Sequence, residues 1–79
     1  MMSIKEQVIS IIIENTGVDP AKVHPEALFE EDLGLDSLYV LDLVVAFEYE
    51  FGVVINDEDI KGLKRVSDAI AFVENRTIE

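Results

Sequence analysis

The 79-residue sequence contains no cysteine and only one histidine, His24. Without cysteine the chain forms no disulfide and no thiolate metal site, and one histidine is too few to build a metal centre. Any thiol chemistry must therefore be brought to the chain from outside. The length predicts one domain over residues 1–79, with a modest hydrophobic core.

Basic residues are also scarce, because six Lys and Arg stand against 17 Asp and Glu, for a net charge of −11. Nucleic acid is excluded as a partner, since phosphate binding requires clustered Lys and Arg. Basic protein surfaces fit such a charge better. Hydrophobic residues make up 49% of the chain, which is too many for a disordered tail. The composition therefore predicts a folded acidic domain with protein partners.

The sequence has no apolar run long enough to span a bilayer and no signal-peptide pattern at its start. We therefore expect a monomer in the cytoplasm that does not insert stably into membranes. The start at Met1, without a flanking linker, favours a separate protein over a module of a larger one.

Local signals predict four helices, and the first spans about residues 3–16. Ser3 and Glu6 form a capping box, and Gly17 follows where a helix would end. A long connection follows over residues 18–36, and its scattered apolar side chains should lie on the core. Asn56 is expected to cap a short third helix, and Ser67 a fourth that ends near residue 75. The prediction is an all-α fold: a four-helix bundle with a short third helix and a long loop between helices 1 and 2.

The second predicted helix, from residue 36 or 37 to 51, carries two apolar stripes. One stripe suits the core of the bundle, and it comprises Val40, Leu43, Val44, Phe47 and Phe51. The other lies on a different face and comprises Leu38, Leu41, Val45 and Tyr49. A small monomer buries one such stripe, so the second either packs under the long loop or stays exposed for a partner.

The segment Asp32-Leu33-Gly34-Leu35-Asp36-Ser37-Leu38 precedes this second helix. By residue type, Ser37 is predicted to be the N-cap. A helix start also offers backbone N–H groups and the positive end of the helix dipole. A phosphodiester on a serine there would lie in a favourable field, and a flexible arm would project away from the bundle.

This segment, followed by an apolar-acidic helix, resembles the acyl carrier proteins. The resemblance continues in three downstream stretches and so covers nearly the whole chain. Residues 47–52 read Phe-Glu-Tyr-Glu-Phe-Gly, residues 55–59 read Ile-Asn-Asp-Glu-Asp, and residues 66–70 read Val-Ser-Asp-Ala-Ile. These stretches look like the end of the family's second helix and the starts of its third and fourth.

The resemblance implies a carrier without catalytic residues of its own and without a resident metal. A phosphopantetheinyl transferase would attach 4′-phosphopantetheine from coenzyme A to Ser37, and Asp36 would help to place the metal and cofactor in that complex. Acyl groups would then be held as thioesters for fatty-acid or specialised lipid and polyketide enzymes. The acyl chain would shelter among core residues, namely Val40, Leu43, Val44, Phe47 and Ile70. The docking face for enzymes would comprise Leu38, Tyr39, Leu41, Asp42, Val45, Glu48 and Tyr49.

Two residues depart from the family pattern on that docking face. Tyr39 and Tyr49 stand where members that serve fatty-acid synthesis usually have acids. This face is therefore less acidic and more aromatic than is typical, and its partners would carry basic or mixed basic and apolar patches. Two interpretations stay open: a specialised pathway, or neutral change at exposed positions.

Other functions fit the residues less well. Read as an EF-hand from Asp57, the sequence puts Lys61 where an oxygen ligand is needed. Ser37 with His24 as base lacks the G-x-S-x-G context of a nucleophile elbow. An aminoacyl or peptidyl carrier would share both the bundle and the modified serine. An acidic helical adaptor differs from a carrier because it never gains mass on Ser37.

Overall fold

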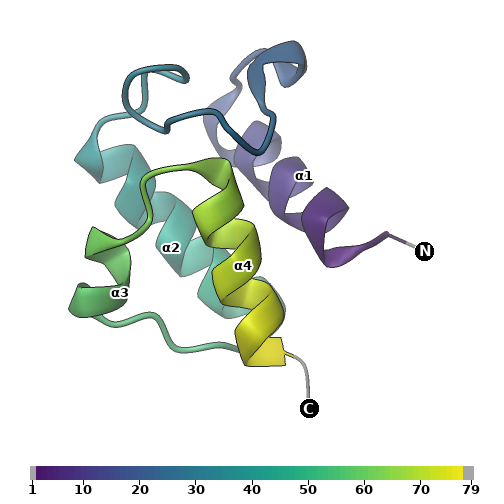
Figure 1. Cartoon of the computed structure of the whole chain (residues 1–79), viewed down its shortest axis with the longest axis vertical. Helices are drawn as coiled ribbons and strands as arrows, with labels where there is room; N and C mark the ends of the chain where they lie inside the picture. The colour runs from purple at the N-terminus through teal and green to yellow at the C-terminus, as the bar shows by residue number, and fades with distance from the viewer. Residues whose placement is uncertain (1, 78–79) are drawn as a thin grey trace.

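A computed structural model describes residues 2–77, which form four α-helices in the predicted order and no strand (Figure 1). The all-α prediction, with a short third helix and a long first loop, is confirmed. One short 3₁₀ turn, η1, was not predicted. The elements are α1 (Ile4–Thr16), η1 (Pro20–Lys22), α2 (Ser37–Phe51), α3 (Asp57–Lys61) and α4 (Val66–Thr77).

The ends of α1 follow from neighbouring residues, as predicted. The Ser3 backbone N–H donates to Glu6 Oε1 at 2.9 Å, and the Glu6 N–H donates to Ser3 Oγ at 3.1 Å. This reciprocal capping box satisfies two N–H groups that have no partner inside the helix. At the other end, Gly17 adopts a left-handed conformation and its N–H donates to the Ile13 carbonyl.

The start of α4 differs from its prediction. We expected Ser67 to cap the helix, but the helix begins at Val66 and extends to Thr77. The residue that satisfies the preceding backbone is Asp68, whose Oδ2 accepts hydrogen bonds from the N–H groups of Lys64 and Arg65 at 3.1 and 2.9 Å. Asp68, the third residue of the helix, therefore binds the backbone ahead of it, and Ser67 lies in the first turn rather than at the cap.

The hydrophobic core lies between α1, α2 and α4, which contact one another pairwise. The largest fully buried side chains come from these three helices and are Phe47, Ile12, Leu43, Val8, Val66 and Val73. The long loop adds further buried side chains, as predicted from its apolar residues: Val23, Ala27, Phe29, Leu33 and Leu35. By contrast, α3 contributes no buried residue and lies at the edge of the bundle.

Backbone hydrogen bonds join the long loop to the start of α4. The Phe29 N–H donates to the Lys64 carbonyl at 2.9 Å, and the Val66 N–H donates to the Ala27 carbonyl at 3.0 Å. The Arg65 guanidinium adds a bond of 2.7 Å to the backbone carbonyl of residue 26. We call this connection between residues 25–29 and 64–67 the loop clip. It fixes residues 28–31 near the start of α2.

Candidate functional site

Ser37 is the first residue of α2 and its side chain is exposed. The N-cap is Asp36 and not Ser37, so the capping prediction was wrong by one residue. Asp36 Oδ1 accepts hydrogen bonds from the N–H groups of Leu38 and Tyr39, both at 3.1 Å. Among residues 2–77, no hydrogen bond engages the Ser37 hydroxyl, so it is open to reaction.

This capping changes the electrostatics that we expected at the helix start. Two of the N–H groups that could have faced a phosphate are already bonded to the Asp36 carboxylate. The negative charge of that carboxylate also offsets the positive end of the helix dipole. The start of α2 therefore offers an exposed hydroxyl rather than a ready anion site.

We expect Asp36→Ala to lower the free energy of unfolding by about 1 kcal/mol, because it removes the cap of the longest helix. Ser37→Ala should change that free energy by less than about 0.5 kcal/mol, since its hydroxyl caps nothing. Urea denaturation of the two unmodified variants, followed by circular dichroism, measures both values. Equal losses for the two variants would contradict the assignment of the cap.

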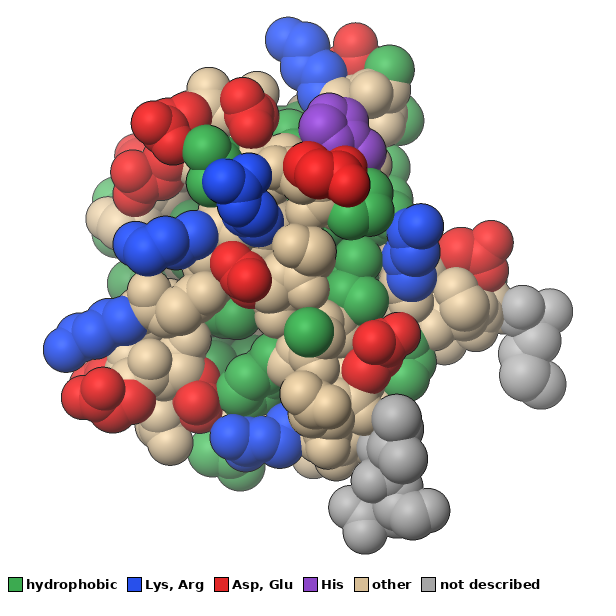
Figure 2. All heavy atoms as spheres, viewed as in Figure 1, with side chains coloured by type: hydrophobic (Ala, Val, Ile, Leu, Met, Phe, Trp, Pro, Cys, Tyr) green, Lys and Arg blue, Asp and Glu red, His purple; other side chains and the backbone are tan. Residues whose placement is uncertain are grey.

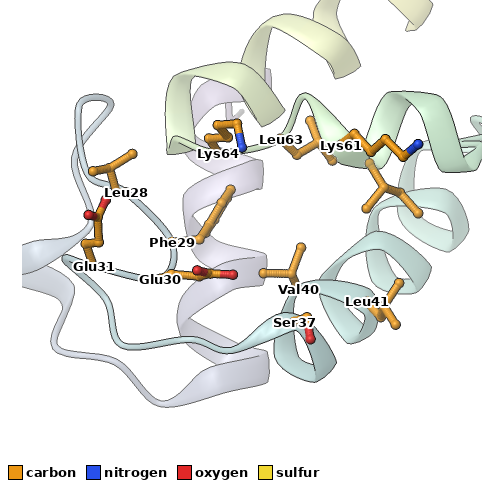
Figure 3. A pocket seen from close by; sticks show the side chains of 11 residues that line it. Leu28, Phe29, Glu30, Glu31, Ser37, Val40, Leu41, Lys61, Leu63 and Lys64 are labelled. Atoms are coloured by element: carbon orange, nitrogen blue, oxygen red, sulfur yellow. The ribbon is translucent and has the colours of Figure 1, made fainter.

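A cavity of about 380 Å³ opens beside Ser37, between the long loop, the first turns of α2 and α3 (Figure 3). Its lining is mainly apolar, with four charged side chains at the rim. The apolar lining residues are Leu28, Phe29, Val40, Leu41, Ile60 and Leu63. The charged ones are Glu30, Glu31, Lys61 and Lys64. Sequence reasoning missed this cavity because the loop clip that positions residues 28–31 joins segments far apart in the chain.

The five residues predicted to shelter an acyl chain occupy two environments. Val40 is half-buried and lines the cavity. The other four are packed inside the bundle with at most 8% of their surface exposed: Leu43, Val44, Phe47 and Ile70. The structure thus brings one of the five to the cavity and places the other four in the buried core.

The residues predicted as a docking face also differ in their exposure. Leu38, Val45 and Tyr49 are 70%, 63% and 87% exposed, which is unusual for large apolar side chains on one helix. Tyr39, Leu41 and Asp42 are exposed as well, and Leu41 also lines the cavity. Glu48 differs from them: it is half-buried, and its Oε2 accepts a hydrogen bond of 2.8 Å from the Ile55 N–H.

Polar contacts hold the α3 side of the cavity. Glu48 anchors the segment before α3 through Ile55, and Arg76 Nη2 of α4 lies 3.7 Å from Asp59 Oδ2 of α3. The Arg76 guanidinium also lies 4.4 Å from the centre of the Phe72 ring. Since α3 has no fully buried residue, these contacts add to the packing of Ile60 against the core in holding its position.

Comparison with known proteins places this geometry in a family. The family model described as "Phosphopantetheine attachment site" matches residues 6–73. A protein named "Acyl carrier protein" from Solidesulfovibrio magneticus is 49% identical over 75 residues, which is 95% of this chain and 96% of the relative. Another of that name, from Nitratidesulfovibrio vulgaris, is 45% identical over 95% of this chain and 99% of its own length.

The chain belongs to the acyl carrier protein family. The predicted family and its cofactor, phosphopantetheine, are thereby confirmed. As an acyl carrier protein, the chain carries acyl groups on phosphopantetheine. Acyl carrier proteins are carriers rather than catalysts, and they interact with a phosphopantetheinyl transferase and with acyl-processing enzymes. Within residues 2–77, no helix has the length and apolar character needed to cross a membrane.

Proposed function

We propose that Ser37 is the residue to which the phosphopantetheine arm is attached and that the neighbouring cavity receives the acyl group. The observation that carries the proposal is an exposed serine hydroxyl, without hydrogen bonds among the described residues, at the edge of a cavity of about 380 Å³. When bound, phosphopantetheine supplies the thiol that this cysteine-free chain lacks. The Ser37 Oγ supplies the oxygen of the phosphoester.

The surrounding residues have separate roles in this proposal. Asp36 holds the first turn of α2 in place through its cap, so that the Ser37 hydroxyl stays oriented outward, and its second carboxylate oxygen is available to the transferase complex. The apolar lining from Phe29 to Leu63 shields methylene groups from water. A longer chain would extend from Val40 toward Leu43 and Phe47, where the core would have to open.

Trypsin offers a direct test of the attachment site. No Lys or Arg occurs between Lys22 and Lys61, so one tryptic peptide spans residues 23–61, and Ser37 is its only aliphatic hydroxyl. After incubation with coenzyme A and a broad-specificity transferase, intact mass should show one added arm, and only this peptide should carry it. An arm on any other peptide would overturn the assignment of Ser37.

We further propose that the exposed side of α2 is the docking face for acyl-processing enzymes. Support comes from Leu38, Val45 and Tyr49, which form a line of exposed apolar side chains on this helix. No Lys or Arg lies between residues 23 and 60, whereas eleven acids do. An apolar line with only acids around it suits a partner surface that combines an apolar pocket with basic residues.

The two tyrosines should set partner preference. A carboxylate at the rim of an interface mainly speeds encounter, whereas a tyrosine provides a broad apolar contact that anchors the complex. We expect Tyr39→Asp with Tyr49→Glu to raise turnover by general fatty-acid-synthesis enzymes and to weaken binding to the cognate enzyme by about tenfold or more. Steady-state acyl transfer with the holo proteins, at low and moderate salt, measures both.

A charge-matched control separates position from net charge. Val54→Asp with Ala71→Glu also adds two acids at exposed positions, but outside α2. This control should leave turnover by the general enzymes and binding to the cognate enzyme unchanged. If wild type already serves the general enzymes well and neither double variant alters the kinetics, the tyrosines have no role in partner choice.

A further inference from the structure

The cavity beside Ser37 has a basic side that is unusual in this acidic chain. Residues 23–60 contain no Lys or Arg, and both Lys61 and Lys64, which follow directly, line the cavity. Figure 2 shows basic side chains gathered over α3 and the loop that joins it to α4. In Figure 3 Lys61 lies at the end of α3 and Lys64 lies beside the start of α4, above Phe29, while Glu30 and Glu31 lie on the long loop.

Neither lysine is strongly paired within the protein. Lys61 Nζ lies 3.9 Å from Glu58 Oε2, but the two side chains are 76% and 86% exposed, so the pair contributes little. None of the ion pairs among residues 2–77 includes Lys64. Arg65, the residue after Lys64, instead donates to a loop carbonyl. The cavity rim therefore keeps two positive charges that can meet an anion.

The acidic and the basic residues of the rim come from different segments of the chain. Glu30 and Glu31 come from the long loop, while the lysines come from the end of α3 and the segment after it. Glu30 and Glu31 repel an anion at the cavity mouth, whereas Lys61 and Lys64 attract it. The apolar lining between them suits methylene groups rather than charge.

We propose that Lys61 and Lys64 bind an anionic oxygen group of the attached arm or its cargo. Ammonium groups bind both phosphate and carboxylate. Two groups meet this description: the phosphodiester that joins the arm to Ser37, and a carboxylate at the far end of a carboxyacyl group. In the second case, this carrier is suited to acyl chains that end in a carboxylate. The inference rests on attachment of the arm at Ser37.

Four states of the protein distinguish the two sources: apo, holo, butyryl-holo and succinyl-holo. Butyryl and succinyl groups have the same chain length, and only succinyl ends in a carboxylate. The measurement is the NMR chemical shift of each lysine side chain. If the phosphodiester is bound, the Lys61 and Lys64 signals move between apo and holo and not afterwards. If the carboxylate is bound, they move in the succinyl state and not in the butyryl state.

Variants test whether the lysines act on the cargo. Lys61→Gln with Lys64→Gln should make the succinyl thioester about two- to fivefold more reactive toward hydroxylamine if the carboxylate is bound, the factor expected from an exposed ion pair. If the phosphodiester is bound, the variant should instead remove the apo–holo shift differences at the residues that flank the two lysines, Gly62 and Leu63. The control, Lys5→Gln with Lys22→Gln, removes the same charge at exposed positions outside the cavity. Its hydroxylamine reactivity and its spectra should match those of wild type.

The outcomes separate this inference from the attachment proposal. If intact mass shows the arm on Ser37 but the Lys61 and Lys64 signals are the same in all four states, the inference alone is wrong. It is also wrong if Lys5 and Lys22 respond as strongly as the cavity lysines. If no arm is found on Ser37, the attachment proposal is wrong and this inference with it.

Discussion

Ser37→Ala is expected to eliminate phosphopantetheine incorporation completely while the helices remain intact. The variant removes the only serine in the first turn of α2, and no described hydrogen bond of the fold uses its hydroxyl. Asp36 continues to cap the helix, so stability should change by less than about 0.5 kcal/mol. Intact mass after incubation with coenzyme A and transferase measures incorporation, and circular dichroism monitors the fold.

Ser67→Ala is the matched control for this experiment. Ser67 is also a serine in the first turn of a helix, α4, but it lies away from the cavity. The control should incorporate one arm per chain at the wild-type rate. Undiminished labelling of Ser37→Ala would show that another hydroxyl accepts the arm.

Phe47→Ala is expected to unfold the protein at room temperature. Phe47 is 2% exposed at the centre of α2, and its ring centre lies 6.4 Å from that of Phe51. Removing a buried phenyl ring costs about 3–5 kcal/mol, and a core of this size supplies about the same amount. Far-ultraviolet circular dichroism and urea denaturation measure the loss.

Tyr49→Ala provides the comparison within the same helix. Tyr49 is 87% exposed, so its removal leaves no cavity and should change stability by less than about 0.5 kcal/mol. The same variant should nevertheless weaken docking to the cognate enzyme. If both aromatic variants lost equal stability, the division of α2 into a buried and an exposed face would be wrong.

The helix boundaries that the sequence predicted correctly depend on neighbouring residues. Ser3 with Glu6 and Asn56 with Asp59 each form reciprocal hydrogen bonds over three residues, which a sequence displays directly. Gly52 ends α2 by a conformation that glycine adopts without strain. Such signals require no knowledge of the rest of the fold.

The predictions that were wrong concerned residues with a competitor nearby. At the start of α2, Asp36 and Ser37 are both good capping residues, and only the backbone decides between them. At the start of α4, the helix begins at Val66, ahead of the Ser67 that we expected to cap it, and Asp68 binds the backbone before the helix. The first error was of one residue and the second of two, and the first changed the expected role of Ser37, the proposed attachment site.

The cavity was beyond prediction from the sequence for a different reason. Its walls come from the long loop, α2 and α3, and backbone bonds join the loop to residues 35 to 42 positions later in the chain. Periodicity and capping signals describe contacts within a turn or two and do not report such pairs. The second apolar stripe of α2 was predicted, because the helical repeat alone places its residues on one face.

The loop clip also bears on how sequences in this fold can diverge. Its bonds join main-chain N–H and carbonyl groups, such as those of Phe29 and Lys64, and every residue except proline offers both groups. Substitutions at the neighbouring positions Leu28, Glu30 or Glu31 can therefore change the size and charge of the cavity while the scaffold stays in place. Selection for a new acyl group can act on the lining of the cavity without having to redesign the bundle.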